Sequence, residues 1–144
     1  MEFIASASMD SSKILLAVVD KKNDDLVGNI SLQNINFFNR EAEIAITIRR
    51  EAPPSANIES MGLMISHGFE RLNLNRIYGA CDENLSHWVD MMGILGMRIE
   101  GRERQAIFRN NQFRDTISFS VLRSEYDAIL RARSGNILFE SHSQ

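Results

Sequence analysis

Five arginines are grouped in the last third of the chain, and their side chains could bind a charged ligand. They are Arg98, Arg102, Arg104, Arg109 and Arg114. A planar guanidinium can hold a phosphate through two parallel hydrogen bonds, so the group could bind an anionic acceptor. Alternation along a hairpin would equally place several of them on one solvated face. Both interpretations stay open.

Other residue types with reactive chemistry are sparse. Cys81 is the only cysteine, which excludes an intrachain disulfide and is typical of a cytoplasmic protein. We expect it to fill space in a strand rather than to react. No His, Cys, Asp or Glu residues have metal-ligand spacing, so no metal site is predicted.

The composition is that of an ordinary globular protein. The chain has 144 residues, of which 44% are hydrophobic and 24% charged, with a net charge of −3. This charge gives no reason to expect nucleic acid, and no apolar run is long enough to span a membrane. One domain over residues 1–133 and a loose tail over 134–144 are predicted.

Three antiparallel strands are predicted in the first third of the chain. An apolar run forms Lys13–Lys21, a polar turn follows, and Leu26–Asn34 returns as the second arm of a hairpin. Ala42–Arg50 alternates isoleucines with polar or small residues, as a half-buried strand does.

A helix should follow Pro53 and Pro54, which must end the third strand because proline donates no hydrogen bond to a ladder. We expect it from about Ser55 to Leu72, with Ser55 or Asn57 as N-cap. Residues spaced by three and four form its apolar stripe, namely Ile58, Met61, Ile65, Phe69 and Leu72.

The rest of the chain predicts a strand, a second helix and a final hairpin. The strand is Arg76–Asp82, the helix begins near Asn84, the hairpin joins Met97–Arg109 to Asp115–Leu122, and Ser124–Arg131 adds a short helical turn. The fold class is therefore α/β (α+β). It has a mixed, mostly antiparallel sheet and two main helices, in the order β-β-β-α-β-α-β-β.

This order, with three sequence segments, resembles the GNAT superfamily of N-acetyltransferases. The segments are LVGNISLQNINFFNREAEIAI, HGFERLNLNRIYGACDEN and GMRIEGRERQAIFRNNQFRDTISFSVLRSEY. The similarity spans roughly Ser12 to Tyr126 and is to the branch of ribosomal-protein, polyamine and nucleotide-sugar acetyltransferases. It implies acetyl-coenzyme A as co-substrate and a small-molecule or peptide amine as acceptor. The acceptor could be a protein N-terminus, a polyamine or an amino sugar.

The resemblance also implies where the coenzyme lies. Two neighbouring strands, here Ala42–Arg50 and Arg76–Asp82, should splay apart around it. Main-chain groups of about Ile46, Thr47 and Ile48 would bind its pantetheine arm. Asn84 matches an asparagine that contacts this arm in the family, although it would also serve as a helix N-cap.

The loop that should cradle the pyrophosphate departs from the family pattern of Q/R-x-x-G-x-G/A. It reads Ala52-Pro53-Pro54-Ser55-Ala56-Asn57, with both glycines replaced and two prolines without N–H groups. N–H groups remain to bind the anion, and Arg49 and Arg50 could supply charge or simply be a solvated strand end. The retained N–H groups belong to Ser55, Ala56, Asn57 and Ile58.

The catalytic residues implied by the resemblance are Glu43 and Ser86. Glu43 occupies the acidic position of the family's A-E-I-G-I strand and would act as general base through water. It could equally do no more than pair with an arginine such as Arg40. Ser86, or His87 as the alternative, would protonate the departing thiolate, in a helix that lacks the tyrosine often used for this step.

The family usually begins with a strand and two helices ahead of the first hairpin. Met1–Met9 could be only the last turn of the second of these helices. The apolar flank left uncovered predicts a homodimer, or else a truncated chain.

Two functions follow from these observations. The first is an acetyl-coenzyme A-dependent N-acetyltransferase, supported by the whole resemblance. The second is an inactive binding or dimerisation module, suggested by the proline loop, the short front and the missing tyrosine.

Overall fold

The computed structural model describes residues 2–5, 11–133, 135 and 137, with only the backbone for residues 2–5. The chain divides into two compact units, residues 1–77 and 78–144. The elements are β1 (Glu2–Ala5), β2 (Ile14–Asp20), β3 (Asp25–Asn36), β4 (Glu41–Ile48), α1 (Ala56–Glu70), β5 (Arg76–Asp82), α2 (Ser86–Ile94), β6 (Arg98–Arg109), β7 (Gln112–Leu122) and α3 (Arg123–Ala132).

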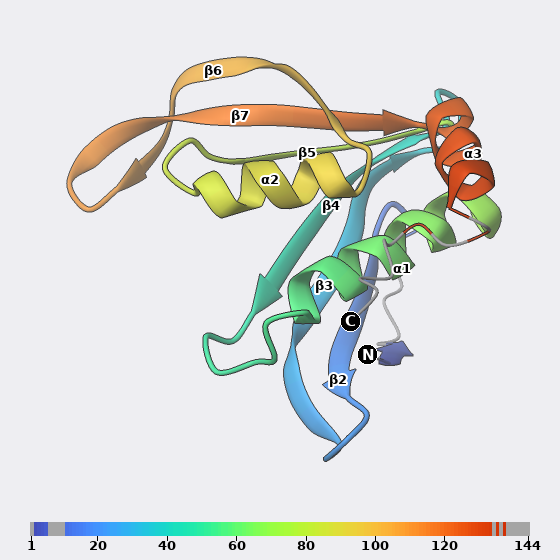
Figure 1. The fold of residues 1–144 in the computed structure, drawn as a ribbon. Helices are drawn as coiled ribbons and strands as arrows, with labels where there is room; N and C mark the ends of the chain where they lie inside the picture. The colour runs from blue at the N-terminus through green and yellow to red at the C-terminus, as the bar shows by residue number, and fades with distance from the viewer. Residues whose placement is uncertain (1, 6–10, 134, 136, 138–144) are drawn as a thin grey trace. The chain divides into compact units, whose positions relative to one another are not determined.

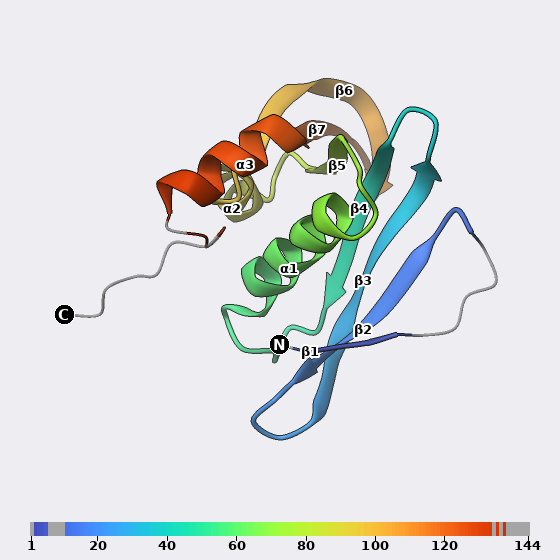
Figure 2. The same cartoon turned by 90° about the vertical axis from the view of Figure 1, so that its right-hand side faces the viewer.

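The first unit is an antiparallel sheet with one helix on one face. The strands lie in the order β1-β2-β3-β4, and the start of β5 follows β4. Helix α1 packs against β3 and β4 (Figures 1 and 2). Met61, Met64, Ile65 and Phe69 of this helix are buried. The core of this unit therefore lies between α1 and the sheet.

Two glycines of this unit allow close packing. A Cβ atom on Gly28 of β3 would lie 2.1 Å from the carbonyl oxygen of Thr47 on β4, so no larger residue fits without moving the strands. A Cβ atom on Gly68 of α1 would lie 2.7 Å from Ile77 and 3.2 Å from Leu32. Gly68 thus brings the helix close to the sheet.

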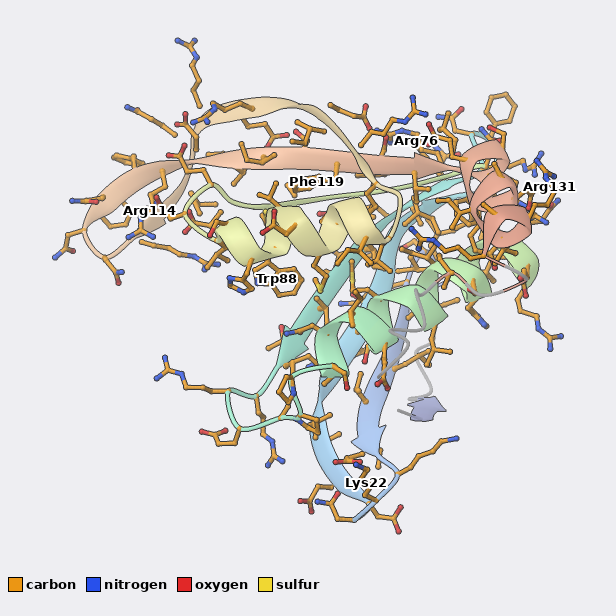
Figure 3. The ribbon with its side chains drawn as sticks, in the orientation of Figure 1. Lys22, Arg76, Trp88, Arg114, Phe119 and Arg131 are labelled. Carbon is orange, nitrogen blue, oxygen red and sulfur yellow. The ribbon has the colours of Figure 1, made fainter. Side chains whose placement is uncertain are left out.

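The second unit contains β5-β7-β6 in that order, together with α2 and α3. Strands β6 and β7 form a long hairpin, and Asn110 and Asn111 at its turn have φ values of 51° and 59°. Asparagine tolerates this left-handed conformation, which suits a two-residue hairpin turn. Figure 3 labels Arg114 near the turn and Phe119 further along β7.

The predicted order of elements is confirmed, and β5 has the predicted bounds. Two predictions are corrected. Met1–Met9 is not a helical turn in its described part, because Glu2–Ala5 pairs with β2 as strand β1. The turn expected at Ser124–Arg131 is a helix of ten residues, α3, and a bond from the Leu122 N–H to the Glu125 carboxylate caps its start.

Helix α1 is shorter than predicted at both ends, with Ser55 as its N-cap residue. Most of the predicted tail, 134–144, lies outside the described residues. Among the described residues, no helix is both long and apolar enough to cross a membrane.

Candidate active site

On the side of β4 that faces away from β3, where β5 is the next strand of the sheet, main-chain groups lie at the predicted coenzyme-binding positions. The Arg49 N–H donates to the Val27 carbonyl at 2.8 Å, which fixes Gly28 and Ile48 as a non-hydrogen-bonded pair. Thr47 then exchanges its hydrogen bonds with Asn29, whereas the N–H and C=O groups of Ile46 and Ile48 point away from β3. Of the three predicted residues, only Thr47 has its main chain committed to β3.

Glu43 lies on the same strand and has a side-chain partner. Its Oε2 atom accepts a hydrogen bond of 2.8 Å from Nδ2 of Asn34, and Gln33 lies directly opposite it on β3. The arginine suggested as an alternative partner, Arg40, instead bonds to the carbonyl and side chain of Asn73. The carboxylate of Glu43 is thus held by a neutral amide and only half-buried.

The start of α1 offers fewer donors than the sequence predicts. The Ala56 N–H donates to the Pro53 carbonyl at 2.9 Å, which closes a turn and removes one of the four expected groups. The N–H groups of Ser55, Asn57 and Ile58 have no partner among the described residues. Ser55 occupies the N-cap position, but its side chain makes no capping bond.

Two buried oxygen atoms in the first turns of α1 also lack partners. They are Oδ1 of Asn57 and Oγ of Ser60, and Ser60 is fully buried. Arg49 and Arg50 are exposed at the end of β4, shortly before the helix. Unpartnered N–H groups, a helix N-terminus and two cations fit a pyrophosphate in part, with fewer donors than a glycine-rich loop supplies.

Asn84 and Ser86 lie in the second unit, at the approach to α2. Asn84 is not the N-cap, because Leu85 holds that position and the helix begins at Ser86. The Asn84 N–H donates to Oδ1 of Asp82 at 3.0 Å, which fixes Asn84 before the helix instead. The side chains of Asn84 and Ser86 are exposed.

An ionic network that the sequence did not predict anchors this approach. Arg114 pairs with buried Asp82 at 3.0 Å, and Arg102 pairs with Glu83 and with Asp115, the latter at 3.2 Å. The N–H of Asn84, and then Arg114, hold the pKa of Asp82 below its ordinary value. The N–H of Gln105, and then Arg102, lower the pKa of Asp115. Arg98 pairs with Glu125, so three of the five hairpin arginines bind carboxylates of the chain itself.

The structure therefore groups the predicted residues by unit. Glu43, Ile46 and Ile48 share β4, and the Ser55–Ile58 segment opens α1 in the same unit, whereas Asn84 and Ser86 belong to the other. Asn34 and Asp82 were missed, although an acidic residue that ends a strand is a recognisable loop anchor. Within the described ranges, no group of three or more His, Cys, Asp or Glu residues could hold a metal ion.

Residues 2–98 match the family model of the acetyltransferase (GNAT) domain. An uncharacterised N-acetyltransferase p20 of Bacillus licheniformis is 24% identical over 127 residues, which cover 88% of this chain and 71% of the relative. A putative ribosomal N-acetyltransferase, YdaF of Bacillus subtilis, is 32% identical over 71% of this chain and 56% of its own length. The chain thus spans little more than half of the second relative.

The fold is also similar to solved acetyltransferases. The spermidine N-acetyltransferase of Vibrio cholerae, solved with coenzyme A and spermine, has a TM-score of 0.77 and 25% identity. The match covers 82% of this chain and 70% of that one. A dodecameric structure of the same enzyme has a TM-score of 0.76, with 81% of this chain and 68% of that chain covered.

Proposed function

Because the chain belongs to the GNAT family of acetyltransferases, we propose that it transfers an acetyl group from acetyl-coenzyme A to a primary amine. The main observation in support is the side of β4 toward β5, where the main-chain groups of Ile46 and Ile48 are not used by β3. An extended pantetheine arm can pair with such groups as an added strand does. The N–H groups and cations at the start of α1 would hold the pyrophosphate less tightly than a glycine-rich loop.

The proposed reaction uses the chain's own groups as follows. The amine nitrogen attacks the thioester carbon, and the N–H of Ile46 stabilises the oxyanion that forms. Glu43 takes the proton of the amine through a water molecule. When the C–S bond breaks, the thiolate of coenzyme A takes up a proton, a role for which the resemblance implies Ser86. Exchange with solvent returns a proton to Ser86 and removes one from Glu43, and the products are an amide and the free thiol.

Spermidine is the first acceptor to test. The fold resembles an enzyme solved with spermine, and another relative carries the name of a ribosomal N-acetyltransferase. Release of the coenzyme A thiol should be measured with spermidine, with a peptide amine and with an amino sugar. Faster release with one of them would identify the acceptor class.

A second candidate, an inactive binding module, is favoured by the proline loop. Pro53 and Pro54 have no N–H, and the Ala56 N–H is taken by the Pro53 carbonyl. Thermal unfolding with acetyl-coenzyme A distinguishes the two. At 100 times its dissociation constant, the ligand should add about 2.7 kcal/mol, which for a chain of this size is on the order of 8 °C.

The outcome of the binding test decides between these functions. No shift at millimolar acetyl-coenzyme A would favour the inactive module. If the coenzyme binds, Glu43→Gln should lower kcat much more than it changes affinity. An unchanged kcat would remove Glu43 as the base.

The homodimer and the cytoplasmic location remain predictions of the sequence. One similar structure is described as dodecameric, which supports self-association without fixing its number. Light scattering coupled to size-exclusion chromatography would give the mass in solution, and a monomer would contradict the predicted dimer.

A further inference from the structure

Strand β3 contains a bulge opposite the start of β4. Gln33 pairs with Glu43 and Asn36 pairs with Glu41, so Asn34 and Ile35 together oppose one residue, Ala42. Asn34 has a φ of 52°, a left-handed conformation that asparagine tolerates better than most residues. The Ile35 N–H leaves the β4 ladder and donates to the Ser12 carbonyl at 2.9 Å.

The bulge changes which side chains enter the core. Before it, Ile30 and Leu32 are fully buried, and after it the odd-numbered Ile35 is 8% exposed. Without the extra residue, strict alternation would place Ile35 on the face that carries Gln33 and Glu43. Burial of Ile35 therefore explains the bulge, whereas it does not explain why the extra residue is an asparagine.

The side chain of Asn34 explains that choice. Its Nδ2 atom lies 2.8 Å from Oε2 of Glu43, so the amide donates to one oxygen of the carboxylate. A glutamate side chain on a strand otherwise explores several rotamers, and a donor anchored in a bulge restricts them. One carboxylate oxygen is engaged, and Oε1 remains for a second partner, since no described residue donates to it.

We propose that Asn34 is a positioning residue for Glu43 and orients its free oxygen toward the acceptor amine. This inference rests on the proposed function, in which Glu43 is the general base. Asn34 would touch neither substrate nor coenzyme. Its contribution would be alignment of the base, which affects the chemical step and not the binding of acetyl-coenzyme A.

The substitution Asn34→Gly tests this role without disturbing the backbone. Glycine adopts positive φ freely, so the bulge should persist while the amide is lost. We expect kcat with saturating acceptor to fall about tenfold. The KM for acetyl-coenzyme A should stay within about twofold of the parent value, and the midpoint of thermal unfolding should change little.

Two further variants make the test specific. Asn111→Gly makes the same change at another asparagine of positive φ, 59°, in the second unit, and should leave kcat unchanged. In a Glu43→Gln background, Asn34→Gly should lower kcat no further, because the group that it positions is already inactive.

The outcomes separate this inference from the proposed function. Parental kcat in Asn34→Gly would overturn the positioning role. The same tenfold loss in the Glu43→Gln background would also overturn it, since Asn34 would then act independently of Glu43. Failure of the parent protein to release any coenzyme A thiol would overturn the proposed function, and the inference with it.

Discussion

The two helices that follow β4 and β5 differ in the residues that lead up to them. Before α2, the N–H groups of Glu83, Asn84 and Leu85 all have acceptors, which are supplied by Asp115 and Asp82. Before α1, two prolines have no N–H and that of the N-cap residue Ser55 has no described partner; the same holds for Asn57 and Ile58 in the first turn of the helix. The N–H groups of Ser86 and His87, inside α2, also have no described partner, so the contrast lies in the residues up to the N-cap: Leu85 donates to Asp82, whereas Ser55 has no described acceptor. The difference separates a structural anchor before α2 from the proposed binding surface at the start of α1.

Removal of Asp82, which anchors the segment before α2, should have the largest effect on stability. Asp82 is 6% exposed, and its carboxylate accepts from both Asn84 and Arg114, so Asp82→Ala leaves a half-buried guanidinium without its partner. We expect the midpoint of thermal unfolding to fall by several degrees. The midpoint of Asp82→Asn, which keeps one acceptor oxygen, should fall less than that of Asp82→Ala.

The matched control is Glu51→Ala in the approach to α1. Glu51 is exposed, and no hydrogen bond or ion pair is seen for it among the described residues. Its removal should leave the midpoint unchanged within about 1 °C. If Asp82→Ala and Glu51→Ala lowered the unfolding midpoint equally, the proposed difference between the segments that precede α1 and α2 would be contradicted.

The anchor should also make stability sensitive to acid. The pKa values of Asp82 and Asp115 are lowered in the folded chain from an ordinary value of 3.8. A lowered folded pKa gives stability that is present above the unfolded pKa and is lost as pH falls through the folded one. The free energy of unfolding should therefore be steady above about pH 5 and decline below about pH 4.

Urea unfolding at a series of pH values measures this decline. In Asp82→Asn the curve should be flatter below pH 4, because one of the two linked protonation sites is gone. An identical decline in the parent and the variant would show that Asp82 makes no contribution to acid sensitivity.

The sequence predicted the fold through its hydrophobic spacing. Of the predicted stripe, Met61, Ile65 and Phe69 are buried. The two end members, Ile58 and Leu72, are only half-buried, and Leu72 lies beyond the end of α1. Gly68, which allows α1 to approach Leu32 and Ile77, carries no periodic signal and was missed. Spacing predicts which face is buried, but not how closely two elements approach.

The candidate site was only partly accessible to the same reasoning. Glu43 and the start of α1 could be named because they occupy positions of motifs in the family that the sequence resembles. The direction of the main-chain groups of Thr47 depends on its register with Asn29, and the bulge at Asn34 depends on the burial of Ile35. Both are consequences of strand pairing, which a local sequence pattern does not contain.

Removing positive charge just before α1 should lower the affinity for acetyl-coenzyme A and leave the stability of the fold almost unchanged. Arg49 and Arg50 are exposed, so replacing both with alanine should barely change the unfolding midpoint. If they attract the pyrophosphate, the affinity for acetyl-coenzyme A should weaken about tenfold, and less at high salt. Isothermal titration would measure both affinities.

Arg71→Ala is the control for this change. Arg71 is also exposed, but it lies at the opposite end of α1, as its C-cap. An equal loss of affinity in Arg71→Ala would mean that only the net charge of the protein matters. The local interpretation requires the effect to be confined to the Arg49 and Arg50 substitutions.

The smallest change in affinity for acetyl-coenzyme A should come from restoring one N–H donor to the proline loop. The Ala56 N–H bonds to the Pro53 carbonyl, and Ser55 has φ −80° and ψ −9°, as at the third position of a type I turn. Pro54 therefore presets this turn, and Pro54→Ala should keep its shape and supply one N–H at a cost of about 0.5–1 kcal/mol in stability. If that N–H faces the bound pyrophosphate, affinity for acetyl-coenzyme A should improve about threefold, which corresponds to one modest hydrogen bond. Unchanged affinity with reduced stability would mean that Pro54 serves the turn alone, and that the loop's shortage of donors does not limit binding.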